Sequence, residues 1–242
     1  EVPSRGLGDV YKRQLWMLPG HLVVSERNDP SRQRLSFPWP RLQGWLWCRA
    51  DRVTANTAGV LEALQRRNSE ISSRMNLLPN PLVLGSAHRD AIGWSDKFER
   101  PAFIAVCRLV PQKGIDLLLE AYAALSPAIH SQWRLLIIGE GPERAALEQR
   151  TSDLQLAERI HFLGFQPDPI RYFRDAEVFV LPSRFEGMPN ALLEAMGCGL
   201  ASIVSDASPG PLEVVRDEQS GLVVPSGSIP ALTAAMERLA LD

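Results

Sequence analysis

The feature that most constrains the fold is a regular alternation of short apolar runs with helical patterns, from residue 102 to the end of the 242-residue chain. The apolar runs, such as FIAV, LLII and VFVL, lie at 102–107, 134–138, 160–163, 178–181, 201–204 and 221–224. Helical patterns separate or follow them at 115–125, 142–150, 170–175, 190–196, 211–215 and 229–239. Strands that alternate with helices form a parallel sheet through right-handed crossovers. Continuous apolar strands indicate burial on both faces of that sheet. The sequence therefore predicts a doubly wound α/β domain.

The part of the chain before residue 81 is shorter and less regular. It has strand-like runs at 22–25, 52–55 and 75–78, and helical patterns at 42–50 and 58–67. Pro79-Asn80-Pro81 follows, and its two prolines favour an extended linker. A unit with two or three strands buries too little apolar surface to be stable alone. We therefore expect residues 15–80 to be the C-terminal part of a truncated domain, and residues 81–242 to be the doubly wound domain.

Residues 1–14 read EVPSRGLGDVYKRQ, begin without methionine, and show neither helical nor strand periodicity. Segments of this kind are excluded when a fold is inferred from sequence. We expect residues 1–14 to be a non-native or disordered leader, and the gene to be cut at its 5′ end.

Charge and cysteine content narrow the classes of function. The chain has 26 basic and 28 acidic residues spread along its length, for a net charge of −2. No polybasic region therefore points to nucleic acid as a partner. The three cysteines are far apart and match no metal-ligand or disulfide spacing, which favours a reducing compartment. No run of about 18 apolar residues could span a bilayer, and no signal peptide pattern is present. These features predict a cytoplasmic protein.

A tryptophan-rich segment precedes residue 50. It contains Trp39, Trp45 and Trp47, together with Leu42, Leu46 and Arg41. A helix of this composition can lie in the plane of a membrane interface. Packing against the missing half of the N-terminal domain is the alternative. Peripheral contact with the inner face of the membrane is thus one of two expectations for this segment.

The predicted topology places a ligand site. The commonest order of strands in a doubly wound sheet of six is 3-2-1-4-5-6, and ligands bind where this order reverses, outside the carboxyl ends of the first and fourth strands. The loop after the first strand reads RLVPQKG from residue 108, and the loop after the fourth reads SRFEGMPN from residue 183. Both loops are rich in polar groups. The turn at 126–131, on the opposite edge, is generic.

The first of these loops has the chemistry of a diphosphate site. Arg108 and Lys113 bracket a turn that opens a helix near Gly114. A helix N-terminus presents unpaired amides, and two flanking cations complete a site for phosphate groups. The alternative interpretation is a pair of solvated surface charges. The loop has neither a GxGxxG nor a P-loop pattern, which argues against a dinucleotide cofactor or ATP hydrolysis.

The second loop has the chemistry of a hydroxyl site. Glu186 lies in the turn, and Glu194 lies about one turn inside the following helix. Gly187 allows close approach of the backbone to a ligand, and Met188 and Asn190 expose amides near the helix start. Carboxylates accept hydrogen bonds from the hydroxyls of a sugar or ribose, so the two loops together describe a nucleoside diphosphate sugar. Taken singly, Glu194 could be an exposed helix residue and Glu186 a partner of the helix dipole.

Several motifs resemble those of one enzyme family. They are CRLVPQKGIDLLLEA at 107–121, IIGEGPERAALE at 137–148, IHFLGF at 160–165 and VFVLPSRFEGMPNALLEAMGCGLASIVSD at 178–206. The chain resembles a retaining glycosyltransferase of family 4, of the type that builds bacterial surface polysaccharides. The resemblance implies the GT-B fold, which has two Rossmann-like domains. The segments VVSERNDP and ADRVTANTAGVLEAL are similar to the end of the acceptor domain in that family.

The resemblance implies a role for each matching residue. Arg108 and Lys113 would hold the donor diphosphate and stabilise the leaving group. Glu186 would face the donor sugar, so these three residues form the catalytic set. Glu194 would bind the ribose hydroxyls, and the amides of 187–190 would contact sugar and phosphate.

The resemblance also implies the rest of the reaction. Gly164 and Phe165 would lie near the base of the nucleotide. Transfer would proceed with retention, without a metal and without a cofactor beyond the nucleotide sugar. The acceptor would be a glycan or a lipid-linked sugar. Because most of the acceptor domain is expected to be missing, we expect weak donor binding and little turnover from this chain.

Three other functions remain open on the sequence. Two carboxylates could serve a glycosidase, in which they stand roughly 5 to 10 Å apart, but this leaves Arg108 and Lys113 without a role. A sugar-nucleotide epimerase of similar fold would share the diphosphate site. A non-catalytic module that binds sugar nucleotides would share the whole site.

Overall fold

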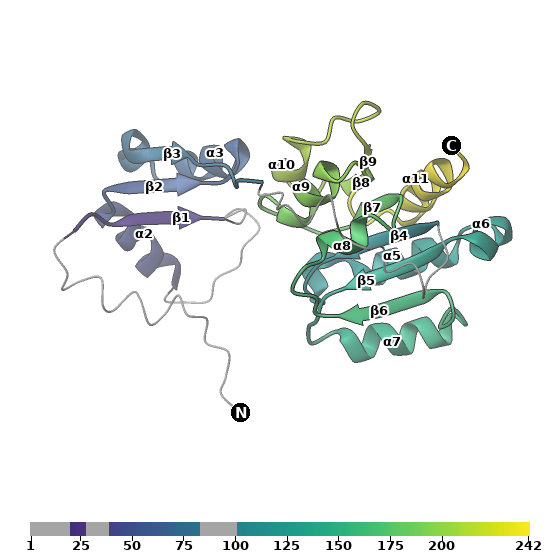
Figure 1. Ribbon diagram of the computed structural model, residues 1–242. Helices are drawn as coiled ribbons and strands as arrows, with labels where there is room; N and C mark the ends of the chain where they lie inside the picture. The colour runs from purple at the N-terminus through teal and green to yellow at the C-terminus, as the bar shows by residue number, and fades with distance from the viewer. Residues whose placement is uncertain (1–19, 28–38, 83–100) are drawn as a thin grey trace.

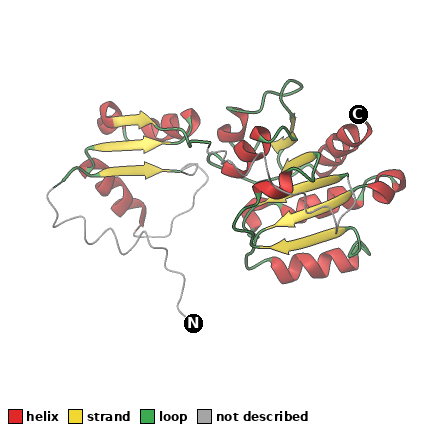
Figure 2. Ribbon diagram, viewed as in Figure 1, coloured by secondary structure: helices red, strands yellow, loops and turns green. Residues whose placement is uncertain are grey.

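The computed structural model of the protein describes residues 20–27, 39–82 and 101–242. The leader expected at 1–14 lies outside these residues. Two α/β units lie side by side, the N-terminal one in purple and blue and the C-terminal one in teal to yellow (Figure 1). Each unit consists of a sheet with helices packed against it (Figure 2).

The C-terminal unit has a six-stranded parallel sheet in the order β6-β5-β4-β7-β8-β9. Its strands are β4 (Ala102–Val106), β5 (Arg134–Ile138), β6 (Ile160–Gly164), β7 (Val178–Leu181), β8 (Ala201–Ser205) and β9 (Leu222–Val224). In chain order this is 3-2-1-4-5-6, so the predicted topology is confirmed. The neighbouring strands at the point of reversal are β4 and β7.

Helices cover both faces of this sheet. They are α5 (Ile115–Ala123), α6 (Pro127–Gln132), α7 (Arg144–Asp153), α8 (Ile170–Phe173), α9 (Asn190–Gly197), α10 (Pro209–Leu212) and α11 (Ile229–Leu241), with a short 3-10 turn η2 (Pro111–Lys113). Phe103 of β4 packs in one core with Leu118 of α5 and Met236 of α11. Its neighbour Ile104 packs in a second core with Leu192 of α9. Successive side chains of a strand point to opposite faces, so the strands are buried on both sides, as their apolar runs predicted.

Two predictions of local structure were wrong. The turn expected at 126–131 is mostly helix α6, because Ser126 is followed by Pro127, and proline is favoured at the first helical position. Its residue Ile129 is buried in the core, which stabilises the short helix. Helix α10 begins at Pro209 and not at 211, for the same reason.

The N-terminal unit has a three-stranded parallel sheet in the order β1-β2-β3. Its elements are β1 (Val23–Glu26), α2 (Trp39–Arg49), β2 (Arg52–Ala55), α3 (Ala58–Arg67), the 3-10 helix η1 (Ser69–Arg74) and β3 (Met75–Leu77). Trp47, Val53 and Leu64 are buried in its core. The bounds of β2 and α3 agree with the sequence prediction. Across the described ranges, every helix falls short of the length and apolar character that a bilayer-crossing segment requires.

The two units contact each other through α3 and α10. The carboxylate of Glu213 accepts hydrogen bonds from the backbone N–H groups of Ala58 (3.0 Å) and Gly59 (2.9 Å) at the start of α3. A side chain at Gly59 would lie 2.3 Å from Cβ of Pro209, so the backbones approach closely here. The carboxylate of one unit therefore caps a helix of the other.

Candidate functional site

The loops that follow β4 and β7 are bonded to each other. The backbone N–H of Arg184 donates to the carbonyl of Gln112 at 2.8 Å, and Nε2 of Gln112 donates to the carbonyl of Phe185 at 2.9 Å. The guanidinium of Arg184 forms a two-pronged pair with the carboxylate of Asp116, at 2.8 and 2.6 Å. Its hydrogen bonds hold the pKa of Asp116 below the usual value. The structure thus brings together two segments about 70 residues apart, as the topology predicted.

Two side chains meet across this junction. Nζ of Lys113, at the end of η2, lies 2.5 Å from Oε1 of Glu186, in the loop after β7. Their side chains are 15% and 7% exposed. The hydroxyl of Ser183 donates to the same carboxylate oxygen at 2.7 Å, and the N–H of Glu186 donates to the hydroxyl of Ser208 at 3.0 Å. A buried charge is costly unless it is paired and hydrogen-bonded, and these contacts supply both.

The pairing was not predicted from the sequence. Lys113 was expected to hold a diphosphate and Glu186 to face a sugar. Lysine has three N–H donors, and one of them is used by Glu186. Oε2 of Glu186 has no hydrogen-bond partner within the described residues. Both groups therefore keep the capacity to bind a ligand.

Close backbone approaches keep the two loops in place. Gly114 has φ +66°, in the left-handed region, and an added Cβ would lie 2.3 Å from the carbonyl oxygen of Pro182. An added Cβ at Gly210 would lie 1.8 Å from the carbonyl oxygen of Gly187. Any residue other than glycine would push these segments apart. The glycines allow α10 and η2 to pack directly on the loop after β7.

Arg108 follows β4 and is exposed. It forms no ion pair with any residue in the described part of the chain. Its neighbour Cys107 is half-buried, and desolvation raises the pKa of this thiol to about 12, with Lys113 opposing the shift and Glu186 adding to it. The thiol is therefore protonated at neutral pH and is no nucleophile. The exposed guanidinium of Arg108 is open to an anion.

Glu194 lies half-buried on α9. Burial, and then the charge of Asp168, raise the pKa of this carboxyl above its usual value. The carboxylate has no hydrogen-bond partner among the described residues. A partly desolvated carboxylate without a donor is suited to accept hydrogen bonds from the hydroxyls of a ligand.

The end of β6 supplies a further surface. Gly164 has φ +71°, its carbonyl accepts the N–H of Gly139 at 2.8 Å, and the next residue, Phe165, is 73% exposed. An added Cβ at Gly164 would lie 3.1 Å from the carboxylate of Glu140. This carboxylate is paired with Arg144 at 2.6 Å. The pair was missed as a site feature, although both residues belong to the motif IIGEGPERAALE.

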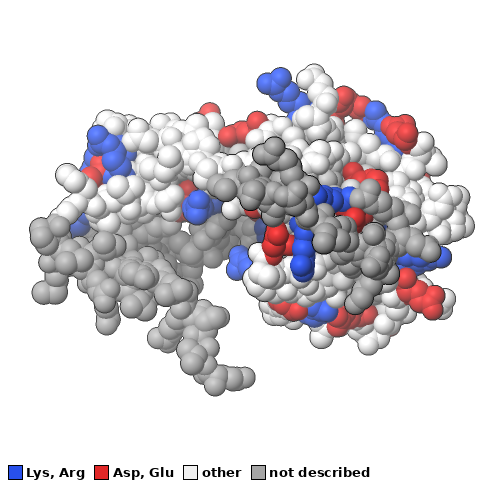
Figure 3. All heavy atoms as spheres, in the orientation of Figure 1, with Lys and Arg blue, Asp and Glu red and all other residues white. Residues whose placement is uncertain are grey.

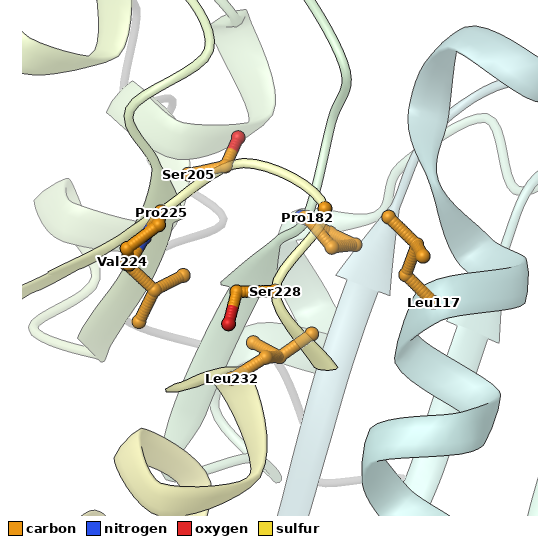
Figure 4. Close-up of a pocket in the computed structure, with 8 residues that line it drawn as sticks. Leu117, Pro182, Ser205, Val224, Pro225, Ser228 and Leu232 are labelled. Atoms are coloured by element: carbon orange, nitrogen blue, oxygen red, sulfur yellow. The ribbon is translucent and has the colours of Figure 1, made fainter. Parts of the chain in front are cut away.

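A separate cavity lies beside Pro182, the residue that follows β7. Leu117, Pro182, Ser205, Val224, Pro225, Gly227, Ser228 and Leu232 line it, and their side chains converge from α5, α11 and the strand ends in Figure 4. Its volume of about 10 Å³ is about that of one water molecule and far below that of a sugar. On the face shown in Figure 3, basic and acidic side chains are interspersed among the described residues. Neither feature competes with the loops after β4 and β7 as a ligand site.

The sheet is doubly wound, and polar loops lie where its strand order reverses. These two features are typical of α/β proteins that bind ligands at the carboxyl ends of their strands. Comparison with known families is more specific. Residues 91–242 match the family described as glycosyl transferases group 1, and the chain belongs to this family.

Two of the curated relatives are bacterial glycosyltransferases. The chain is 32% identical over 211 residues to the N-acetylgalactosamine-N,N'-diacetylbacillosaminyl-diphospho-undecaprenol 4-alpha-N-acetylgalactosaminyltransferase of Campylobacter jejuni, covering 84% of this chain and 56% of that protein. It is 29% identical over 196 residues to the lipopolysaccharide core biosynthesis glycosyltransferase LpsE of Rhizobium meliloti, covering 79% and 54%. The chain thus spans about half the length of these relatives.

Solved structures of glycosyltransferases share the fold. The pneumococcal O-GlcNAc transferase GtfA, in complex with UDP and GlcNAc, superposes with a TM-score of 0.78 at 22% identity, over 98% of this chain and 48% of that one. Anabaena HepE, in complex with UDP and glucose, superposes with a TM-score of 0.77 at 22% identity, over 92% and 62%. The expected GT-B type of α/β fold is confirmed.

Proposed function

We propose that this chain carries the donor site of a retaining glycosyltransferase of family 4, which transfers a sugar from a nucleoside diphosphate sugar. The observation that supports this most directly is the cluster at the carboxyl ends of β4 and β7. Arg108 is exposed there without an ion-pair partner among the described residues, and Lys113 is paired with Glu186. Two cations and one carboxylate at a point of strand reversal suit a diphosphate joined to a sugar.

The proposed chemistry follows from these charges. When the bond between C1 of the sugar and the diphosphate oxygen breaks, negative charge grows on the leaving diphosphate, and Arg108 and Lys113 stabilise it. Glu186 orients Lys113 and directs its second oxygen toward the sugar. The acceptor oxygen bonds to C1 on the same face, and its proton passes to the departing diphosphate oxygen. No side-chain base is required, and we propose that no metal is required.

The remaining donor contacts are part of the same proposal. Glu194 accepts hydrogen bonds from the ribose hydroxyls, and the exposed ring of Phe165 with Gly164 forms a surface beside the base. The backbone N–H groups of Gly187, Met188 and Asn190 donate to no backbone acceptor within the described residues, and we assign them to sugar and phosphate oxygens of the donor. No cofactor other than the donor itself takes part.

The acceptor is proposed from the relatives. The Campylobacter protein is named for a diphospho-undecaprenol substrate, and LpsE for lipopolysaccharide core biosynthesis. We propose a glycan or lipid-linked acceptor in the synthesis of a bacterial surface polysaccharide. Residues 15–80 then form the end of the acceptor domain and residues 81–242 the donor domain.

A lipid-linked acceptor would bring the protein to the cytoplasmic face of a membrane. In α2 (Trp39–Arg49), Leu42 and Trp45 are 39% and 37% exposed, Arg41 is exposed, and the guanidinium of Arg49 lies 4.4 Å from the centre of the Trp45 ring. The helix contains no acidic residue. An apolar and basic surface of this kind suits an anionic bilayer interface, and we propose that α2 contacts it.

Calorimetry with UDP and GDP tests the donor site. We expect the wild-type chain to bind at least one of them, and Arg108→Ala to weaken that binding about tenfold or more, since one charge-assisted contact is lost. Arg66→Ala is the matched control, because Arg66 is an exposed arginine on α3, 3.8 Å from Glu62. Equal affinities of the wild type and Arg108→Ala contradict the assignment. Release of an inverted sugar nucleotide in the absence of acceptor would favour an epimerase instead.

Flotation with vesicles tests the membrane contact. Vesicles that contain anionic lipid should carry the wild-type chain, and Trp45→Ser should reduce the bound fraction. Leu212→Ser is the control, because Leu212 is equally exposed on the C-terminal unit. The same bound fraction for all three proteins would show that α2 does not contact the membrane.

A further inference from the structure

Asn80, in the segment after β3, joins the two units at the loop that follows β7. Its side-chain amide Nδ2 donates to the carbonyl of Met188 at 3.2 Å and to Oδ1 of Asn190 at 2.7 Å. Its Oδ1 accepts a hydrogen bond from Nη2 of Arg27 at 2.9 Å. One side chain thus connects the residue after β1 with both sides of Pro189.

The local sequence holds Asn80 in this position. It lies between Pro79 and Pro81, which restrict the backbone on both sides to an extended path. Only one orientation of its amide satisfies these partners, because the Arg27 guanidinium needs an oxygen acceptor and the Met188 carbonyl needs an N–H donor. Asn80 is half-buried, which reduces competition from water.

The loop that Asn80 contacts is the one to which the proposed function assigns the donor sugar. Met188 lies two residues before α9, and Asn190 is the first residue of this helix. Among the described residues, no backbone acceptor receives the N–H groups of Gly187, Met188 or Asn190. Asn80 forms one hydrogen bond with Met188 and one with Asn190, so it holds the chain on both sides of Pro189. These bonds fix the path of the backbone that carries the three N–H groups. Arg27 on the opposite side of Asn80 ties that path to the N-terminal sheet.

We propose that Asn80 is a positioning residue, which aligns the 187–190 loop for the sugar part of the donor only while Arg27 of the N-terminal unit holds its amide. The inference rests on the proposed function, because it assumes that this loop contacts the donor. Arg108 and Lys113 bind the diphosphate from the loop after β4 and do not contact Asn80. The contribution of the sugar to affinity therefore depends on Asn80 more strongly than the contribution of the diphosphate, which Arg108 and Lys113 also bind.

The test compares binding of a nucleotide and its sugar conjugate. Calorimetry with UDP, UDP-glucose, GDP and GDP-mannose gives the ratio of affinities of conjugate to nucleotide for each variant. Asn80→Asp keeps the oxygen that accepts from Arg27 and removes the N–H donor to Met188 and Asn190. We expect the ratio of conjugate to nucleotide affinity to change at least fivefold in this variant, while the affinity for UDP or GDP changes less than twofold. Arg27→Met should change the ratio in the same direction.

Glu213→Gln is the control. It weakens the other contact between the units, at the start of α3, and should leave the ratio unchanged. Thermal unfolding checks that each variant is folded. An unchanged ratio in Asn80→Asp, a ratio of one in the wild type, or a change as large in Glu213→Gln overturns the inference. A wild-type chain that binds neither UDP nor GDP contradicts the proposed function itself, so the two failures are distinguishable.

Discussion

The pair formed by Lys113 and Glu186 should affect stability and ligand binding in different ways, and a double-mutant cycle separates the two. Lys113→Met leaves a carboxylate that is 7% exposed without its cation. Loss of one partner of a buried pair costs about 3 to 5 kcal/mol, and the remaining hydrogen bond from Ser183 favours the lower end, about 3 kcal/mol. Glu186→Gln leaves the more exposed Lys113 unpaired and should cost about 2 kcal/mol.

The double variant should be more stable than the sum of these losses predicts. Without either charge there is no uncompensated buried group, so we expect a loss of about 1 kcal/mol relative to the wild type. Urea unfolding followed by circular dichroism measures the free energy of unfolding of the four proteins. Arg66→Met is the control for an exposed ion pair and should cost less than about 0.5 kcal/mol.

Binding should not recover in the double variant. Lys113→Met should weaken binding of UDP or GDP by about 1 to 3 kcal/mol, because a charge-assisted contact to phosphate is lost, and the double variant should show the same loss. Additive losses of stability would show that the two side chains do not interact as the structure indicates. Wild-type affinity in the double variant would refute the role of Lys113 in the diphosphate site.

Four further predictions concern the ribose site, the base site, the packing of α10 and the metal requirement. Burial and Asp168 raise the pKa of Glu194, so this carboxylate loses its charge as the pH falls through the raised value. The ratio of the UDP affinity of the wild type to that of Glu194→Gln, measured by calorimetry, should therefore fall at a higher pH than the usual glutamate pKa predicts. A ratio that does not change with pH contradicts this. Phe165→Ala should weaken UDP or GDP by about 1 to 3 kcal/mol without changing the affinity for pyrophosphate, if base stacking is its role. Gly210→Ala should lower the melting temperature more than Gly227→Ala, whose added Cβ meets nothing within 4 Å and whose cost comes from its φ of +79° alone. Equal shifts would argue against close packing of α10 on the loop. Transfer by the full-length enzyme should be unchanged in EDTA, and its loss with recovery on added Mg²⁺ would show a metal requirement.

The order and approximate bounds of the strands could be predicted because strands that are buried on both faces are continuous apolar runs in the sequence. β5 and β7 are continuous apolar runs, and their bounds agree with the prediction. The starts of helices were predicted less well, because a proline can begin a helix at a position that the pattern of apolar residues does not mark. The starts of α6 and α10 show this.

The location of the candidate site could also be predicted, because the point of strand reversal follows from topology alone. The contacts within it could not. Lys113 and Glu186 are 73 positions apart, and no spacing in the sequence relates them. Asp116 and Arg184 form a bidentate pair for which there is likewise no local signal. Such pairs depend on how the loops after β4 and β7 pack together, and that packing is set by the whole fold.

The central claim is that the diphosphate of a nucleotide sugar binds between the loops after β4 and β7. A crystal structure of the chain soaked with UDP or GDP tests it most directly. We expect phosphate oxygens within hydrogen-bond distance of Arg108 and Lys113, with the ribose beside Glu194. A nucleotide bound elsewhere on the sheet, or at this edge with its phosphates away from both cations, would contradict it.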